Sequence, residues 1–295
     1  MRAARLHELG GTPRIDEIDA PEGPNVIAVR AAGLNPVDIA IGTGRFYGGS
    51  PPTPYVLGSE GVGTTADGRR VWFRGSGTIA QQAAAAVQQT LDIPDGVADE
   101  LALACGIAGL TGWLAVSWRA QVTAEDTVLV LGASGTVGAA AVQGAKLLGA
   151  RRVFGAARQT RLVPAAADAT VELGDSYELP EATVVIDALW GTPAERALEA
   201  AAPGVRFVQL GQSAGPTATL QSGWVRGKVA EIRGHSLFST PRDVIAAGYR
   251  ELCEHAREGR IQFDTETFEL DDIATAWERQ ASGSPGAKIV VRIGS

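Results

Sequence analysis

The hydrophobic and polar positions divide the chain into two regions with different patterns. In the first hundred residues, short β-like runs such as 25–31 and 70–74 are separated by clusters of glycine and proline. This pattern is typical of a β-rich region with exposed loops. From Asp99 a helical stretch rich in alanine and leucine continues to Trp118, and after it apolar β-branched runs alternate with helical segments. Alternating strands and helices predict a parallel sheet covered on both faces.

The same pattern sets the expected domain boundaries. Strands of the parallel sheet are predicted over residues 127–131, 153–157, 183–188, 206–210 and 231–234. The rest of the chain is predicted to contain a helix over 242–258, a strand near Thr267, a short helix from Asp272 and a final strand over 288–293. These last pieces are too few for a third domain, so we expect them to return to the first. The predicted domains are 1–106, completed by 240–295, and 107–239.

A glycine-rich turn joins a predicted strand to a predicted helix. The strand ends at Gly132, and Ala133-Ser134-Gly135-Thr136-Val137-Gly138 leads into a helix over 139–148. In such a turn Gly135 lets the backbone approach a pyrophosphate, Gly138 lets the helix pack closely on the strand, and the N–H groups at the helix start attract the anion. Ala133 stands where the usual motif has its first glycine, so the match is weaker than the full form. Its context favours a Rossmann dinucleotide site over a loop that merely turns the chain.

The residues after the next strand indicate which dinucleotide is bound. An acidic residue about 20 positions after the turn would bond the 2'-hydroxyl of the ribose. The sequence there is Ala156-Ala157-Arg158-Gln159-Thr160-Arg161, with no carboxylate and two guanidinium groups. Guanidinium groups pair well with a 2'-phosphate, so we expect NADPH as the cofactor. The alternative is that Arg158 and Arg161 are solvated residues at a helix start.

Three further segments carry a family resemblance. They are Ala31-Ala32-Gly33-Leu34-Asn35-Pro36-Val37-Asp38, Pro54-Tyr55-Val56-Leu57-Gly58-Ser59-Glu60-Gly61-Val62-Gly63 and Gly109-Leu110-Thr111-Gly112-Trp113. With the glycine turn they make nearly the whole chain resemble the zinc-free medium-chain dehydrogenase/reductases, in particular the quinone oxidoreductase-like branch. The resemblance implies an α/β fold, with a GroES-like β-rich catalytic domain and a Rossmann domain built on a doubly wound parallel sheet.

The resemblance also predicts that no metal is used. Zinc-dependent members carry a cysteine in the first of these segments and a histidine in the second, and Asn35 and Ser59 stand in those places here. Neither residue is a serviceable zinc ligand, and the four-cysteine lobe of those enzymes is absent. Without zinc the easier chemistry is hydride delivery to a quinone or to the β-carbon of an enone.

We therefore expect a zinc-independent oxidoreductase that transfers hydride from NADPH to a quinone or an α,β-unsaturated carbonyl, for example a polyketide-like enone. One alternative is a non-catalytic NADPH-binding sensor or structural relative, because the sequence contains no identifiable catalytic acid. Another is a carbonyl reductase, which would need a clear proton donor at the carbonyl oxygen.

The resemblance implies roles for single residues. Asn35 and Asp38 would lie in a loop beside the nicotinamide, Thr111 near the nicotinamide ribose, and Tyr47 at the rim of the substrate cleft. Tyr47 could give a hydrogen bond or a proton to the developing enolate, or it could be an aromatic residue that only packs under the loop. Asp38 could equally be a turn or cap residue after Pro36.

Segments at the strand ends complete the predicted cofactor site, because open parallel sheets bind ligands beyond the carboxyl ends of their strands. We expect walls from Leu189 and Trp190, close passage at Gly211 and Gln212, and closure by Ser236, Leu237 and Phe238, with Lys288 nearby. Trp190 could instead be an ordinary core residue. The full predicted cofactor set is Thr111, Gly132, Ser134, Gly135, Thr136, Val137, Gly138, Arg158, Arg161, Leu189, Trp190, Gly211, Gln212, Ser236, Leu237, Phe238 and Lys288.

Composition and charge narrow the expected partners. The net charge of −7 disfavours a polyanion such as DNA or an acidic membrane face. No apolar run approaches the length of about 20 residues that a membrane helix needs, and the start of the chain has no signal-peptide pattern, so we expect a cytoplasmic protein. Two cysteines, Cys105 and Cys253, cannot build a disulfide framework. The predicted strand 231–234 could pair two copies into a homodimer.

Overall fold

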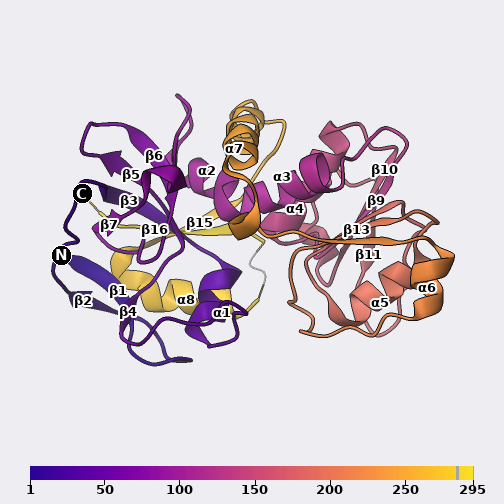
Figure 1. Cartoon of the computed structure of the whole chain (residues 1–295), viewed down its shortest axis with the longest axis horizontal. Coiled ribbons are helices and arrows are strands. Elements are labelled where there is room, and N and C mark those ends of the chain that lie inside the picture. The colour runs from indigo at the N-terminus through magenta and orange to yellow at the C-terminus, as the bar shows by residue number, and fades with distance from the viewer. Residues whose placement is uncertain (284–285, 295) are drawn as a thin grey trace. The chain divides into compact units, whose positions relative to one another are not determined.

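A computed structural model describes residues 1–283 and 286–294. The chain forms two compact units, one made of Met1–Ile107 and Phe263–Ser295 and the other of Ala108–Gln262 (Figure 1). Residues 284, 285 and 295, which belong to the predicted C-terminal part of the first domain, lie outside the described residues. The fold is the predicted α/β type, with a β-rich region and a parallel sheet.

The first unit is built on β-strands. Its strands are β1 (Arg2–Leu6), β2 (Arg14–Glu17), β3 (Val26–Leu34), β4 (Tyr55–Val56), β5 (Glu60–Thr65), β6 (Arg70–Arg74), β7 (Gln82–Ala84), β8 (Thr90–Asp92), β15 (Thr265–Glu269) and β16 (Lys288–Arg292). Its helices are α1 (Pro36–Gly42), η1 (Val87–Gln89), α2 (Asp99–Ala104), η6 (Leu270–Asp272) and α8 (Ile273–Ala281). One sheet has the order β15-β16-β3-β5-β6-β8, with β7 also paired to β3, and a second has the order β2-β1-β4.

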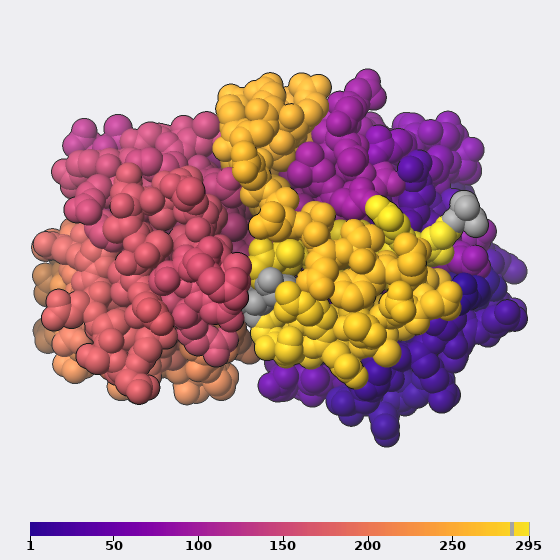
Figure 2. Space-filling view, turned by 180° about the vertical axis from the view of Figure 1, so that it is seen from behind, coloured from indigo at the N-terminus to yellow at the C-terminus, as the bar shows by residue number. Residues whose placement is uncertain are grey.

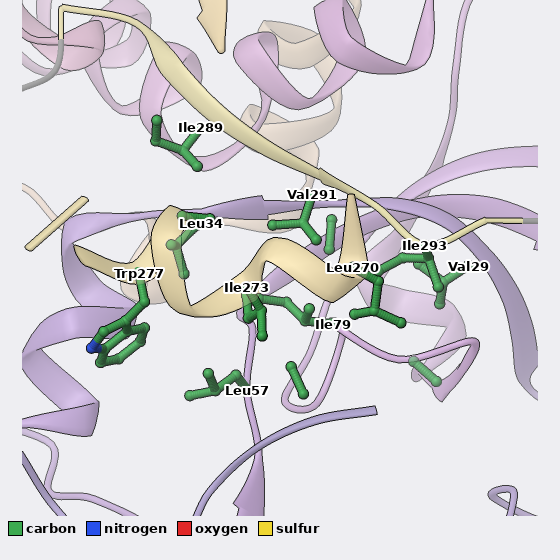
Figure 3. Packing of buried hydrophobic residues seen from close by; sticks show 14 of the residues in the cluster. Val29, Leu34, Leu57, Ile79, Leu270, Ile273, Trp277, Ile289, Val291 and Ile293 are labelled. Atoms are coloured by element: carbon green, nitrogen blue, oxygen red, sulfur yellow. The ribbon is translucent and has the colours of Figure 1, made fainter. Parts of the chain in front are cut away.

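The C-terminal segment completes this first unit, as its sequence predicts. Strand β16 pairs antiparallel with β3, with Ile289 opposite Leu34 and Val291 opposite Ala32. Figure 3 shows Ile273 and Trp277 of α8 among Leu34, Val291 and Leu57. Burying these apolar side chains holds segments from both ends of the sequence in one core. The space-filling view in Figure 2 shows the same yellow C-terminal segment lying against indigo N-terminal segments.

A helical run crosses the boundary between the units. It comprises α2, the π-helical turns η2 (Cys105–Gly109) and η3 (Ala115–Arg119), and α3 (Leu110–Leu114). Gly106 interrupts it, since its ψ of −135° is not helical. Among the described residues, Asp99–Arg119 is the one helix long and apolar enough to cross a membrane. In its apolar stretch of 18 residues, 78% is buried in the protein, as expected of a core helix. Its length and composition are therefore weak evidence for a membrane span.

The second unit is a doubly wound α/β sheet. Its strands are β9 (Thr127–Leu131), β10 (Arg152–Ala157), β11 (Ala169–Glu172), β12 (Val184–Asp187), β13 (Arg206–Gln209) and β14 (Glu231–Gly234). All neighbours pair in parallel, in the order β11-β10-β9-β12-β13-β14. The chain runs outward from β9 to β11 and then returns to β12 on the other side of β9. The strand order therefore switches direction between β9 and β12, where such sheets bind ligands.

Helices cover both faces of this parallel sheet. The helices and helical turns of this unit are α3, α4 (Thr136–Leu147), η4 (Thr160–Leu162), α5 (Gly191–Ala200), α6 (Ser222–Gly227), η5 (Leu237–Ser239) and α7 (Arg242–Arg257). Figure 1 shows α5 and α6 on one side of the strands and α3 and α4 on the other. On the α5 side, Val185 and Phe207 of the sheet share a buried cluster with Leu198 of α5.

Helix α7 belongs to the second unit, although we expected residues 240–262 to return to the first. A side chain at Gly248 would meet Leu114 at 2.7 Å, so α7 lies closely against α3 at this glycine. The ring of His255 meets Trp113 of α3 edge-on, with 5.2 Å between the ring centroids. Since α7 buries its apolar face against α3, the return to the first unit begins at Phe263 and not at residue 240.

Candidate active site

The glycine turn of the second unit has the geometry that its sequence predicts. Strand β9 ends at Leu131, Gly132 adopts a φ of +82°, and α4 begins at Thr136 with Gly135 as its N-cap. A side chain at Gly138 would collide with the carbonyl oxygen of Gly132 and come within 2.7 Å of the Ala133 Cα. The first N–H groups of a helix have no partner within the helix, so those at residues 136–138 are placed to receive an anion.

Behind this turn, the end of β12 is held in an unusual conformation. Trp190 has a φ of +57° and a ψ of −161°, a backbone conformation that residues other than glycine rarely adopt. One carboxylate oxygen of Asp187 accepts the backbone N–H groups of Leu189 (2.8 Å) and Trp190 (2.9 Å). Burial raises the pKa of Asp187 to about 6, and its other oxygen has no hydrogen-bond partner among the described residues. Asp187 therefore fixes the turn that carries the two predicted wall residues.

A pocket of about 330 Å³ opens beside the same strand ends. Its lining residues are Trp190, Gln209, Gln212, Pro216, Ile232 and Gly234. Gly211 lies close to this wall, because a side chain there would come within 2.8 Å of the Ala188 carbonyl oxygen. The pocket brings together the predicted residues Trp190 and Gln212 from two different strand ends. An indole, two amides and a proline suit a flat ligand with polar edges.

The two arginines after β10 are exposed. Arg161 donates a hydrogen bond to the side-chain oxygen of Gln159 (3.1 Å). Neither Arg158 nor Arg161 forms an ion pair with a carboxylate in the part of the chain that the structure describes. Their charges are therefore available to an anionic ligand at the carboxyl end of β10.

The last predicted segment of the second unit follows β14. His235 is buried there, and burial lowers its pKa to about 4, with the nearby charge of Arg119 acting in the same direction. A hydrogen bond with the backbone of Thr111 opposes this shift, and Nε2 has no partner among the described residues. His235 is neutral at physiological pH and ties the segment carrying Ser236, Leu237 and Phe238 to α3, where Thr111 lies. Leu237 is buried, whereas Phe238 is exposed.

The first unit contains a fully buried polar network centred on Glu60. One carboxylate oxygen of Glu60 accepts the amide of Asn35 (2.9 Å) and the ammonium group of Lys288 (2.6 Å). The other accepts the indole N–H of Trp72 (2.8 Å) and the backbone N–H of Ile107 (2.7 Å). Four donors satisfy this buried charge, as a carboxylate without water requires.

Two glycines make room for this network. A side chain at Gly33 would come within 2.6 Å of Glu60 and 2.7 Å of Lys288. One at Gly106 would collide with Glu60 and come within 2.5 Å of the Trp72 indole nitrogen. The break in the helical run at Gly106 also directs the N–H of the next residue toward Glu60. The glycines of β3 and the helical run are therefore required by the close approach of charged side chains.

Asn35 and Lys288 belong together in this network. Lys288 is the first residue of β16, so it lies in the sheet of the first unit and not at the strand ends of the six-stranded parallel sheet. Its ammonium group donates to the side-chain carbonyl oxygen of Asn35 as well as to Glu60. The Asn35 amide nitrogen donates to Glu60 and, at 3.4 Å, to the Gly33 carbonyl. Both ends of the Asn35 side chain thus have partners inside the network.

Asp38 extends the network to Ser59. One Asp38 oxygen accepts the backbone N–H of Asn35 (2.8 Å) as part of the cap of α1, and the other accepts the hydroxyl of Ser59 (2.6 Å). Burial raises the pKa of Asp38 to about 6, although the two hydrogen bonds and the charge of Lys288 act against the shift. Asp38 is therefore both the expected cap residue and a buried acid that titrates near neutrality.

Tyr47 lies apart from these buried groups. Its side chain is 79% exposed in the loop after α1, and its ring lies 4.5 Å from that of Phe46. The structure brings Asn35, Asp38 and Lys288 together with Ser59 and Glu60, while Tyr47 stays at the surface.

The network does not suit a zinc ion. An amide and a hydroxyl occupy the two places where zinc-dependent members have ligands, and neither is a zinc ligand of ordinary strength. The Lys288 ammonium lies beside them, and its positive charge would repel a metal cation. Among residues 1–283 and 286–294, no group of three or more histidine, cysteine, aspartate or glutamate side chains could hold a metal.

Sequence reasoning missed Glu60 and Trp72 as members of the site. A signal was present, since Glu60 and Lys288 are charged residues that directly precede mostly apolar strand sequences. A buried charge needs a partner, so two such residues of opposite sign can be expected to pair. Nothing in their spacing says that the partners are 228 residues apart.

Comparisons with known proteins agree with this architecture. A family model described as zinc-binding dehydrogenase matches residues 148–291. A phenolphthiocerol/phthiocerol polyketide synthase of Mycobacterium tuberculosis is 28% identical over 99% of this chain. Human quinone oxidoreductase is 37% identical over 50% of the chain. These matches support a medium-chain dehydrogenase/reductase of the quinone oxidoreductase-like branch.

These relatives differ in how much of their own length is matched. The chain spans 14% of the mycobacterial polyketide synthase and 50% of human quinone oxidoreductase. The solved quinone oxidoreductase of Thermus thermophilus, studied with NADPH, has a TM-score of 0.84 and 24% identity, and the likeness covers 99% of this chain and 100% of that one. This likeness confirms the predicted two-domain α/β fold.

Proposed function

We propose that this chain uses NADPH to reduce a quinone or an α,β-unsaturated carbonyl compound, without a metal ion. The quinone oxidoreductase relatives and the solved structures with NADPH favour an NADP(H)-dependent oxidoreductase. The observation that carries the finer proposal is the buried Glu60–Lys288 pair with Asn35, which occupies the place of a zinc site with an internal cation.

The choice of NADPH rests on the second unit. The turn at Gly132–Gly138 supplies backbone N–H groups for a pyrophosphate, and it requires glycine where the strand and helix touch. Arg158 and Arg161, exposed and without carboxylate partners in the described chain, would pair with a 2'-phosphate. Leu189, Trp190, Gly211 and Gln212 would flank the remainder of the cofactor.

The proposed substrates follow from a buried network that does not suit a metal. A simple ketone needs strong polarisation of its carbonyl oxygen, which a zinc ion provides in other members of the superfamily. A quinone or an enone accepts hydride more readily, so hydrogen-bond donors and correct placement are enough. The polyketide synthase relatives, matched over 99% and 65% of this chain, fit an enone as the acceptor, and the quinone oxidoreductase relatives fit a quinone.

When bound, NADPH would supply the hydride. The residues of the chain would hold the cofactor and the acceptor in place and protonate the reduced acceptor. Asn35 and Lys288 keep the segment before α1 fixed through Glu60, so Asp38 and Ser59 present a defined hydrogen-bonding pair. Trp190 is held by Asp187 in a strained conformation that orients the wall of the cofactor site. Tyr47, exposed on the loop after α1, would contact large substrates.

A turnover assay tests this proposal. The purified chain, dialysed against a chelator, is mixed with NADPH or NADH, and absorbance loss is followed with a panel of quinones and enones. We expect oxidation of NADPH in preference to NADH, unchanged by the chelator. Tight NADPH binding without turnover of any acceptor would instead support the sensor alternative. Loss of activity in the chelator that zinc restores would contradict the metal-free proposal.

A homodimer remains a prediction for the same chain. Strand β14 is the edge of the parallel sheet, and Ile232 on it and Val229 just before it are exposed. An unpaired edge with apolar side chains favours strand pairing between two copies. Light scattering of the wild type and of an Ile232→Lys variant would test it, with a monomeric variant expected.

A further inference from the structure

The nearly inaccessible charged groups of the network in the first unit are two acids and one base. They are Lys288, Glu60 and Asp38. Glu60 takes the ammonium group of Lys288 and three further donors. Asp38 takes only two neutral donors, the Asn35 backbone and the Ser59 hydroxyl. Since Lys288 can balance one carboxylate, Asp38 is the member of the network that takes up a proton.

The hydrogen bonds of Asp38 give that proton a path through Ser59. The Asp38 oxygen that accepts the Asn35 N–H is committed to the cap of α1. The other oxygen is 2.6 Å from the Ser59 hydroxyl, close enough for a proton to pass between the two oxygens. Ser59 keeps 9% of its surface exposed, against 3% for Asp38. A hydroxyl can accept a proton on one side and donate one on the other, so Ser59 connects the buried acid to its surroundings.

We propose that Asp38 and Ser59 form a proton relay that protonates the intermediate left after hydride transfer. Asp38 stores the proton, and the Ser59 hydroxyl is the group that touches the substrate. The inference rests on the proposed function and supplies the acid that the sequence did not reveal. It also separates the roles of neighbouring residues, because Asn35, Glu60 and Lys288 become positioning residues.

With an enone as the acceptor, hydride bonds to the β-carbon, the double bond shifts, and an enolate remains. The Ser59 O–H bond breaks toward the enolate α-carbon, and the serine oxygen takes the proton of the Asp38 carboxyl group at the same time. Asp38 is left as a carboxylate and regains a proton from solvent after product release. NADPH is oxidised by two electrons, the enone is reduced by two, and one proton is consumed.

The pH dependence follows from the groups around Asp38. Its pKa is raised to about 6 by burial and to a lesser extent by Glu60, while Ser59, Asn35 and Lys288 oppose the rise. The charge of Asp38 also acts on Tyr55. Burial and this charge raise the Tyr55 pKa to about 12, so the phenol is neutral. Enone turnover should therefore decline as the pH rises through about 6, because the acid form of Asp38 disappears.

The test compares two acceptors on the same variants. Hydride transfer to a quinone leaves a hydroquinone anion that is stabilised by its aromatic ring and can take its proton from water. Ser59→Ala and Asp38→Asn should therefore lower kcat for an enone by about a hundredfold, the usual size of a general-acid effect, and hardly change kcat for a quinone. Asp38→Asn keeps the shape of the side chain but carries no transferable acid proton. It should also remove the pH dependence near pH 6.

Two control variants separate the relay from structural damage. Ser59→Thr keeps a hydroxyl and should retain enone turnover. Thr43→Val removes the bond of the Thr43 hydroxyl to the Ile39 carbonyl at the other end of α1 and should leave the ratio of enone to quinone rates unchanged. Equal losses for both acceptors in Ser59→Ala and Asp38→Asn, or a pH limb that persists in Asp38→Asn, would overturn the relay. A wild type that reduces quinones but no enone would overturn the relay alone, and one that reduces neither would overturn the proposed function with it.

Discussion

The two polar sites of the molecule are built in opposite ways. The site of the second unit uses a turn of consecutive residues with its backbone N–H groups, together with exposed arginines after β10. The network of the first unit uses buried charged side chains from segments as distant as Asn35 and Lys288. A reversibly bound anion needs hydrogen-bond donors that are accessible from solvent. A carboxylic acid with a pKa raised toward neutrality needs burial. Under the proposed function, this contrast corresponds to cofactor binding by the second unit and acid chemistry by the first.

The largest expected effect comes from breaking the buried ion pair. Lys288→Met leaves Glu60 as a buried charge without its cation, which should lower the free energy of unfolding by about 3–5 kcal/mol. Urea denaturation at neutral pH measures this. The double variant Lys288→Met with Glu60→Gln removes both charges and should be more stable than Lys288→Met alone. If both variants unfold at the same urea concentration, the pair does not stabilise the first unit as described.

A second prediction concerns the dependence of stability on pH. The pKa of Asp38 rises from its ordinary 3.8 to about 6 on folding. Its contribution to stability is complete below the lower value and is lost as the pH rises through about 6, about 3 kcal/mol in all. Asp187 acts in the same direction, while His235, whose pKa falls to about 4, loses stabilising energy as the pH falls below 6.5.

Because these residues oppose one another, the test uses the difference between two proteins. We compare the free energy of unfolding of the wild type with that of Asp38→Asn. As the pH rises from 4 to 6, the wild type should lose stability relative to the variant. Denaturant titrations at several pH values measure both free energies. A difference that stays constant across this range would show that Asp38 does not titrate there.

A third prediction concerns the turn of the second unit. Gly138→Ala places a methyl group against the Gly132 carbonyl and the Ala133 Cα, so the turn must shift. We expect a loss of about 1–3 kcal/mol in stability and weaker NADPH binding. Gly174→Ala is a matched control, because nothing lies within 4 Å of the added atom. Cofactor fluorescence titration should separate them, and equal NADPH affinities would contradict the role of Gly138.

The smallest expected effect is on cofactor choice. Arg158→Ala with Arg161→Ala should weaken NADPH binding about tenfold, or about 1.4 kcal/mol, because the exposed guanidinium groups pair with a 2'-phosphate in water. Affinity for NADH, which lacks this phosphate, should remain unchanged. Fluorescence titrations with both cofactors measure the difference, and an equal loss for the two would assign these arginines a different role.

The contrast between the sites also explains what the sequence could predict. Strands β6, β9 and β14 were predicted with their observed bounds, because each is a short run between clear turn or helix signals. The short β11 was missed, since half of its residues are exposed and its apolar content is low. The glycine turn was predicted because a single stretch of sequence contains all of it.

The buried network could be predicted only in part. Asn35 and Asp38 were singled out from a family motif, but the contacts of Asn35 with Glu60 and Lys288 depend on the antiparallel pairing of β3 with β5 and β16. Lys288 was placed near the parallel strand ends, although its own strand was expected to return to the first domain. Long-range strand pairing is set by the packing of the whole unit, and local sequence does not contain it.

The most direct test of the division between the two units measures NADPH affinity and enone turnover in the same variants. In Asp38→Asn, the Kd for NADPH should stay near the wild-type value while kcat for an enone falls. In the Arg158→Ala, Arg161→Ala variant, the Kd should rise while kcat at saturating NADPH stays near that of the wild type. A loss of NADPH affinity in Asp38→Asn as large as that in the arginine variant would contradict the account.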